Sequence, residues 1–164
     1  MKKQTAGSMS PMDYAMQYLT AKDRTVSEMQ EYLDGKTFGE ADVDAAVARL
    51  QELGLLDDRR YARRFVETRL ATKPVSRRHL YEQLRGHGLS EEIIREAMEL
   101  ANADTERENA LAVARKYARQ FAALEPDKRR QRVLNRLEAR GYSYDVARAA
   151  LETALAEEDA WSES

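Results

Sequence analysis

The apolar residues of this chain recur at intervals of three and four positions, which is the spacing of amphipathic helices. Val43, Val47 and Leu50 share one helical face, and Ile93 with Ala97 repeats the pattern further along the chain. No segment alternates apolar and polar residues with the period of two that a half-buried strand requires. The pattern therefore predicts an all-α protein.

Capping residues divide this pattern into separate helices. Thr25 and Glu28 form a T-x-x-E capping box, which begins a helix that runs to about Asp34. Glycines end helices, and prolines begin or break them. The other start and stop signals are Pro11 or Asp13, Gly35, Gly39, Gly54, Asp57 or Asp58, Pro74, Ser76, Gly88, Ser90, Thr105, Pro126, Gly141 and Ser143. Together these signals predict nine helices.

A short phrase, Tyr-Ala-x-x-aromatic, occurs at residues 14–18, 61–65 and 117–121. A repeat with a period of about 50 residues indicates a stacked array of similar units. We interpret the phrase as packing, because its aromatics are i, i+4 neighbours and its alanine lets a neighbouring helix come close. We therefore expect three tandem three-helix repeats, stacked into an elongated, curved array. The expected boundaries are a disordered segment 1–10, repeats 11–56, 57–103 and 104–156, and an acidic tail 157–164.

Composition limits the classes of protein to which this chain can belong. The 164 residues include no cysteine, which excludes disulfides and thiolate metal sites. No apolar stretch is long enough to span a membrane, and no apolar run follows Lys2 and Lys3 as it would in a signal peptide. We therefore expect a cytoplasmic, monomeric protein that has no membrane contact and no cofactor.

The net charge of −2 is unusual for a dedicated nucleic-acid-binding protein, which is generally basic. This overall net charge conceals basic and acidic blocks that alternate along the chain. Residues 57–88 hold nine basic and four acidic groups, net +5, and residues 105–140 hold ten and five, also net +5. Residues 13–53, 89–104 and 141–164 are net −5, −4 and −5. Opposite-sign surfaces are therefore expected in the fold.

Arginines gather on the first and second helices expected in the second and third repeats. Four of them, from Arg129 to Arg140, follow one side of a helix at i, i+3, i+7 and i+11. Arginine forks match phosphate and carboxylate geometry, and Tyr81 offers a stacking face. One interpretation is a groove for nucleic acid or an acidic protein surface, and the other is a solvated face paired with the acidic third helices. The candidate contact residues are Arg59, Arg60, Arg63, Arg64, Lys73, Arg77, Arg78, Tyr81, Arg85, Arg129, Arg132, Arg136 and Arg140.

Arg69 lies on the Tyr61 and Phe65 face of its helix, where an apolar residue is expected. A charge at such a place needs a partner. We therefore expect an ion pair that fixes how this helix docks, with Asp57, Asp58 or Glu82 as the partner. Five residues of this segment are expected to be structural: Asp57, Asp58, Tyr61, Phe65 and Arg69.

Signals for catalysis or metal binding are weak. His79 and His87 are eight residues apart, whereas paired histidine ligands usually stand three or four apart. The chain has no G-x-x-x-x-G-K-[ST] loop, no G-x-S-x-G turn and no cysteine nucleophile. An enzyme is therefore the least favoured class.

Residues 54–70, GLLDDRRYARRFVETRL, resemble the signature of the bacterial RecX family. In that signature a Leu-Asp-Asp turn leads into an aromatic-x-x-x-Phe helix and an arginine. Lys73 follows at the family's place, and residues 80–89 resemble its second-helix ending. The sequence departs from the family at residues 74–76, where Pro-Val-Ser replaces a Gly-x-Gly loop, at Gln83, where the family has an acidic residue, and at His87-Gly88, where the family has Lys-Gly.

The resemblance implies a regulator of the RecA recombinase. Such proteins lie in the groove of the RecA–single-stranded DNA filament, and they lower strand exchange, ATP hydrolysis and coprotease activity in DNA repair and the SOS response. RecA and its single-stranded DNA are then the expected partners, with direct DNA contact left open. Two other hypotheses remain from the residues themselves: a stand-alone nucleic-acid-binding module that uses the arginines, and a structural scaffold.

Overall fold

The computed structural model describes residues 8–164, and the regular structure of that part of the chain is entirely α-helical. The prediction of an all-α fold with nine helices is confirmed for these residues, none of which forms a strand. The helices are α1 (Pro11–Ala21), α2 (Val26–Asp34), α3 (Glu40–Glu52), α4 (Asp58–Thr72), α5 (Arg77–Gly86), α6 (Glu91–Met98), α7 (Ala103–Gln120), α8 (Pro126–Ala139) and α9 (Tyr144–Ser162).

Three consecutive helices form each unit: α1–α3 the first, α4–α6 the second and α7–α9 the third. The helix pairs that pack most closely, such as α7 with α9, lie within one unit. A core this small gains stability from stacking against a neighbour. The largest fully buried side chains include Met29, Leu33 and Leu50 in the first unit, Leu80, Leu84 and Ile94 in the second, and Val133, Leu137 and Leu151 in the third.

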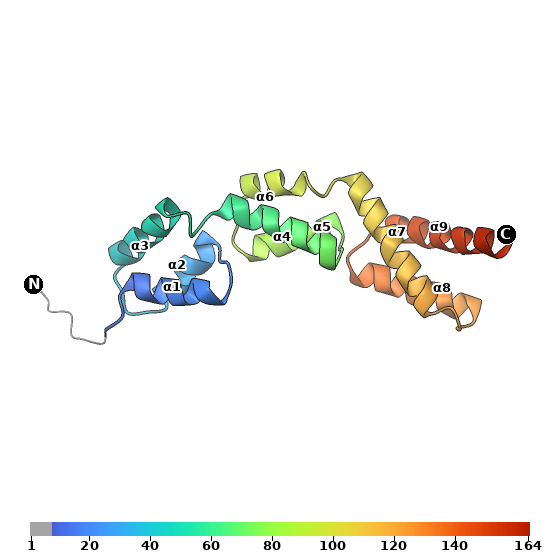
Figure 1. Cartoon of the computed structure of the whole chain (residues 1–164), viewed down its shortest axis with the longest axis horizontal. Coiled ribbons are helices and arrows are strands. Elements are labelled where there is room, and N and C mark those ends of the chain that lie inside the picture. Colours follow the sequence, from blue (N-terminus) through green and yellow to red (C-terminus); the bar gives the residue numbers. More distant parts are fainter. Residues whose placement is uncertain (1–7) are drawn as a thin grey trace, which may run out of the picture.

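The three units stand in a row, as Figure 1 shows, with the first unit at one end and the end of α9 at the other. Helices α3 and α6 follow one long edge of this row, whereas α1 and α8 follow the other. The tandem, elongated arrangement expected from the repeated phrase is confirmed. Most surfaces of such a row face outward, so the molecule presents extended faces to a partner.

Most helix starts fall where the caps predict them, and one does not. Ser76, Ser90 and Ser143 are the N-caps of α5, α6 and α9, as expected. Helix α7 begins at Ala103 instead of at Thr105. The Asn102 side chain accepts a hydrogen bond from the Thr105 N–H at 2.9 Å, so Asn102 is the cap and Thr105 lies inside the first turn.

The two ends of the chain differ in what the structure describes. Residues 1–7, most of the segment predicted to be disordered, lie outside the described residues. Ser10 caps α1 and forms a capping box with Asp13. Helix α9 continues to Ser162, so the acidic segment that begins at residue 157 is helical over most of its length.

The two junctions between units use the same arrangement. Thr25, the N-cap of α2, donates from Oγ1 to the His87 carbonyl at 2.6 Å. Ser76, the N-cap of α5, donates its backbone N–H to the Arg140 carbonyl at 3.0 Å. Thr25 and Ser76 are the two buried polar residues of the described chain. Through these hydrogen bonds, each cap holds the end of the next unit's second helix.

A second link at each junction comes from the residue after the cap. The Val26 N–H donates to Asp58 Oδ1 at 2.9 Å, and the Arg77 N–H donates to Glu106 Oε2 at 2.8 Å. Burial at this junction raises the pKa of Asp58, although the bond from Val26 opposes the shift. In both cases the N-terminus of a second helix binds a carboxylate from the next unit's first helix.

Glycine is required where each junction closes. Gly88 and Gly141 have φ of +78° and +86°, in the left-handed region that favours glycine. A Cβ at Gly141 would lie 2.6 Å from Ser76 Oγ and 2.9 Å from His79 Cβ. A Cβ at Gly88 would meet Ser27 in the same way. These glycines therefore set both the turn and the close approach of neighbouring units.

Candidate nucleic-acid and protein interface

The thirteen candidate contact residues do not share one environment. Some of them pair with the acidic third helices, as the structural interpretation of the arginines predicted. Arg59 on α4 lies 3.6 Å from Glu92 and also bonds Glu96, both on α6. Arg129 on α8 bonds Glu158 on α9 at 2.5 Å. These pairs hold the third helix of a unit against its neighbours.

Three of the arginines donate to backbone carbonyls within the fold. Arg60 donates to the Gly54 carbonyl at 2.7 Å, Arg129 to the Ala118 carbonyl at 2.7 Å, and Arg140 to the Pro74 carbonyl at 3.1 Å. The Arg129 side chain is only 18% exposed. The four arginines from Arg129 to Arg140 therefore do not act as one surface, because the first and the last of them make hydrogen bonds within the fold.

Three more candidates have partners at the surface. Arg64 lies 3.5 Å from Asp23 of the first unit, and Arg78 lies 3.4 Å from Glu82 on its own helix. Tyr81 donates to Glu91 at 2.6 Å, and this hydrogen bond raises the pKa of the Tyr81 hydroxyl. Exposed pairs of this kind contribute little to stability, so a stronger ligand can displace them.

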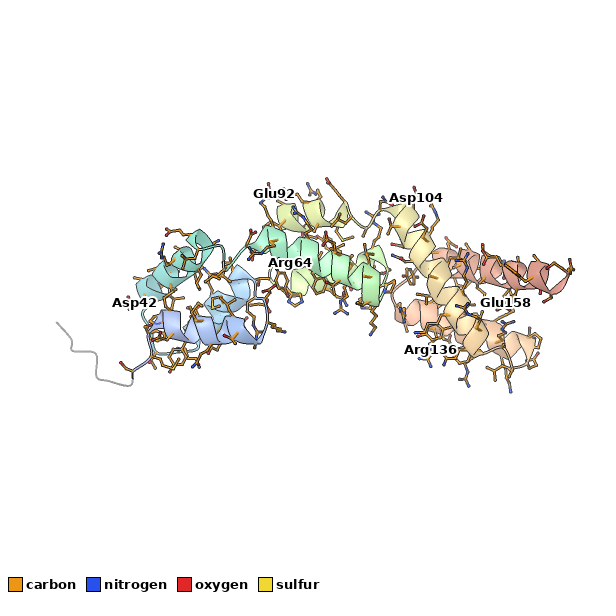
Figure 2. All side chains as sticks on the ribbon, in the orientation of Figure 1. Asp42, Arg64, Glu92, Asp104, Arg136 and Glu158 are labelled. Carbon is orange, nitrogen blue, oxygen red and sulfur yellow. The ribbon has the colours of Figure 1, made fainter. Side chains whose placement is uncertain are left out.

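Six exposed candidates pair with no carboxylate of residues 8–164, and we call them the open cations. Figure 2 shows one of them, Arg136, at the long edge opposite Glu92 and Asp104. Their charge is not neutralised within the described chain, so it is available to an anionic partner. The open cations are Arg63, Lys73, Arg77, Arg85, Arg132 and Arg136.

The repeated phrase divides into two kinds of position. Its alanine is fully buried in every copy, at Ala15, Ala62 and Ala118, so the interpretation of the alanine as a packing position is confirmed. Its aromatics are only half-buried and pack against the edge of each core. In the third unit, Tyr117 and Phe121 have ring centroids 6.1 Å apart. The aromatics therefore reach the surface, which the repeat alone did not indicate.

Cations surround this aromatic pair of the third unit. Arg136 lies 5.5 Å from the Tyr117 centroid and 5.9 Å from that of Phe121, and Lys116 lies 5.4 Å from Tyr117. Arg140 donates to the Tyr117 hydroxyl at 3.3 Å. That hydrogen bond, with the charges of Arg140, Lys116 and Arg136, lowers the pKa of Tyr117. Lys116 was not among the candidate contact residues. Its position directly before Tyr117, an aromatic residue that reaches the surface, is the signal that could have identified it.

The ion pair expected for Arg69 is wrong: no carboxylate of residues 8–164 pairs with it. Its guanidinium carbon lies 5.2 Å from the Phe65 ring centroid. Ala62 and Val66 form the fully buried centre of this helix face, whereas Arg69 continues the half-buried line of Phe65. Arg69 therefore stays partly solvated beside an aromatic ring and needs no buried partner.

The histidines belong to two different junctions. His87 Nδ1 lies 3.1 Å from Tyr61 Oη and 3.5 Å from Glu28 Oε2, between the first and second units. His79 packs beside Gly141, between the second and third. Residues 8–164 contain no group of three His, Cys, Asp or Glu side chains that could hold a metal ion. Within the same residues, no helix combines the length and apolarity needed to cross a membrane.

The fold and the distribution of charge define a class: a tandem helical-repeat protein whose distinctive features lie on extended surfaces. Three family models match consecutive parts of the chain. They describe the first three-helix domain of RecX at residues 12–50, the second at 57–98 and the third at 104–151. The chain belongs to the RecX family.

Individual relatives agree with this assignment. The chain is 30% identical to the regulatory protein RecX of Chlorobaculum tepidum, over 94% of each chain. It is 37% identical to a regulatory protein RecX of Thermus thermophilus, over 82% of this chain and 84% of the relative. The crystal structure of RecX from Lactobacillus salivarius matches the fold with a TM-score of 0.73 at 22% identity, covering 88% of this chain and 94% of that one.

Proposed function

We propose that this protein regulates the RecA recombinase by binding the RecA–single-stranded DNA filament. Its binding lowers recombinase, ATPase and coprotease activity in DNA repair and the SOS response, and it takes place in the cytoplasm. Family membership supports this proposal, because relatives that match 82% and 94% of the chain are named regulatory proteins. The observation that carries it is the set of open cations on an elongated row of units.

A partner that is itself a long polymer suits this arrangement. Arrays of helical units present a continuous surface instead of one pocket. The open cations attract phosphates or carboxylates along that surface, while the acidic third helices carry the opposite sign. A protein–DNA filament offers both kinds of neighbour.

The protein acts by binding instead of by chemistry of its own. Among residues 8–164, the buried polar residues are Thr25 and Ser76, and both are occupied as helix caps at the junctions. Each hydroxyl is engaged in the fold: Thr25 Oγ1 donates to the His87 carbonyl, and Ser76 Oγ accepts a hydrogen bond from the His79 N–H at 3.0 Å. The described chain thus supports a regulator that changes the filament by occupying it.

Binding to preformed filaments tests this proposal. RecA is assembled on immobilised single-stranded DNA with a non-hydrolysable ATP analogue, and association of the full chain is followed by interferometry. We expect saturable binding that the double change Arg132→Glu and Arg136→Glu weakens at least tenfold. The matched control, Arg95→Glu with Arg148→Glu, reverses the same number of charges on the third helices and should bind as the unchanged protein does. Absence of binding by the unchanged protein would overturn the proposal.

A second candidate is a stand-alone nucleic-acid-binding module, favoured by the cations around Tyr117 and Phe121. It requires tight DNA binding without RecA and a steep dependence of affinity on salt. Changing Arg132 and Arg136 together to Glu should then abolish DNA binding. DNA affinity that is unaltered by this change would remove the candidate.

A further inference from the structure

The third unit contains an aromatic surface whose nearby charges are all positive. Lys116, Arg136 and Arg140 lie within 6 Å of the Tyr117 ring centroid, at 5.4, 5.5 and 5.7 Å. No carboxylate of residues 8–164 pairs with these three cations. Three carboxylates of α9 pair with other arginines: Glu152 with Arg130, Glu157 with Arg115 and Glu158 with Arg129.

This cluster is continued by further cations on both sides. Arg132, an open cation, stands one helical turn before Arg136 on α8. Arg140 bonds the Pro74 carbonyl of the second unit, next to the open cation Lys73. A polyanion that reached the Tyr117 ring would therefore meet positive charge before and after it.

The other two units differ in what surrounds their rings, although the second unit contains a similar pair, with the Tyr61 and Phe65 centroids 6.3 Å apart. In the first, the Tyr18 and Tyr32 rings stack on each other at 3.9 Å, and Arg24 covers Tyr18 at 3.7 Å. In the second, Tyr61 stands beside His87, and burial raises its pKa to about 12, with Glu28 adding to the shift. The rings of these units are occupied by intramolecular neighbours or lie near acidic groups, so the third unit is the strongest candidate.

We propose that Tyr117 and Phe121 form a stacking site for the unpaired bases of single-stranded nucleic acid, while Lys116 and Arg136 hold the adjoining phosphates. The inference rests on the proposed function and deepens it by assigning the filament's DNA to particular residues. Bases stack on aromatic rings and on guanidinium planes, and cations beside the rings track the backbone. Tyr117 and Phe121 lie with their planes only 16° apart, an orientation that suits consecutive stacked bases.

An acidic peptide is the other polyanion that could approach this surface. It would use the cations, but its carboxylates, unlike bases, have no π-face to stack on the two rings. The half-buried aromatic pair, present beside the cations, therefore favours nucleic acid over acidic protein. The test below separates the two.

The first experiment compares two DNA probes with the same charge. The full chain is titrated into a fluorescently labelled oligothymidylate, and into an abasic oligonucleotide of equal length, while anisotropy is recorded. Stacking predicts that the abasic probe binds about 5- to 150-fold more weakly for each base lost from the site. Equal affinity for both probes, no binding to oligothymidylate, or displacement of oligothymidylate by polyglutamate as effectively as by unlabelled DNA would overturn the proposal.

Three variants locate the stacking. Tyr117→Leu should weaken oligothymidylate binding at least fivefold, whereas Tyr117→Phe keeps a ring and should retain most of the affinity. Tyr144→Leu changes a tyrosine that is 56% exposed on α9, outside the site, and should have no effect. Thermal unfolding by circular dichroism checks that each variant is folded. Loss of binding in Tyr144→Leu equal to that in Tyr117→Leu would contradict the assignment.

Salt dependence separates the two kinds of contact. Arg136→Gln should reduce the slope of log affinity against log salt by about 0.7, as expected for the loss of one contact to single-stranded phosphate. Tyr117→Leu should lower the affinity and leave that slope unchanged. A change in slope caused by Tyr117→Leu would show that the ring acts through charge and would overturn the stacking role.

The two proposals fail in different ways. If the unchanged protein inhibits RecA but binds abasic and normal DNA equally, the stacking site is wrong and the proposed function stands. If the protein prefers DNA with bases but never affects RecA, the proposed function is wrong and the stacking site stands.

Discussion

Substitution of Gly88 by alanine is expected to destabilise the junction between the first and second units. Gly88 has a φ of +78°, and a Cβ built there lies 2.5 Å from the Ser27 Cβ. Left-handed backbone costs an L-residue about 1–2 kcal/mol, and overpacking a close contact costs about 1–3 kcal/mol. The free energy of unfolding should therefore fall by about 2–5 kcal/mol.

A matched glycine separates these two contributions. Gly54 has a φ of +72°, but a Cβ there has no neighbour within 4 Å. Gly54→Ala should therefore cost only the backbone share, about 1–2 kcal/mol. Adding Ser27→Gly to Gly88→Ala removes the clash, because the Ser27 Cα is 3.9 Å from the added Cβ.

Urea unfolding followed by circular dichroism gives these free energies, and small-angle X-ray scattering reports whether the row of units is kept. Gly88→Ala should be less stable than Gly54→Ala, and Ser27→Gly should recover part of the difference. If Gly88→Ala and Gly54→Ala lose the same stability, then the close approach of units at Gly88 does not contribute to the fold.

Two further predictions concern single side chains. Arg129→Met should lower the free energy of unfolding by about 2 kcal/mol, because the charged hydrogen bonds of Arg129 are lost. Arg132→Met should leave urea unfolding unchanged. Equal effects of the two substitutions would contradict the structural role of Arg129 and the open position of Arg132. Folding raises the pKa of Asp58, mainly by burial, so the stability linked to this group is fully present below pH 3.8 and is lost as pH rises through the raised pKa. Asp58→Asn keeps an acceptor for the Val26 N–H and should gain stability relative to the unchanged protein over that pH range; a difference that does not vary with pH would refute the linkage.

Local signals predicted the helices well because caps and turns act over three or four residues. Thr25, with its capping box, needs no distant partner to begin α2. The error at Thr105 has the same origin, because Asn102 caps the same turn and is an equally good N-cap residue.

The positions of the arginine side chains could not be predicted in the same way. The spacing of Arg129 and Arg132 on one side of a helix says nothing about α9, which bonds the first of them and leaves the second open. Arg69 shows a related limit, because helical spacing placed it on an apolar face without giving the width of that face. Contacts between elements distant in sequence decide both cases.

Inhibition of RecA on single-stranded DNA is the activity that we propose for this protein. The most direct measurement is the rate of DNA-dependent ATP hydrolysis by RecA as the full chain is added in substoichiometric amounts. We expect the rate to fall well before the protein equals RecA in concentration, and the Arg132→Glu, Arg136→Glu variant to need at least tenfold more protein for the same effect. An unchanged rate at every ratio of the two proteins would contradict the account.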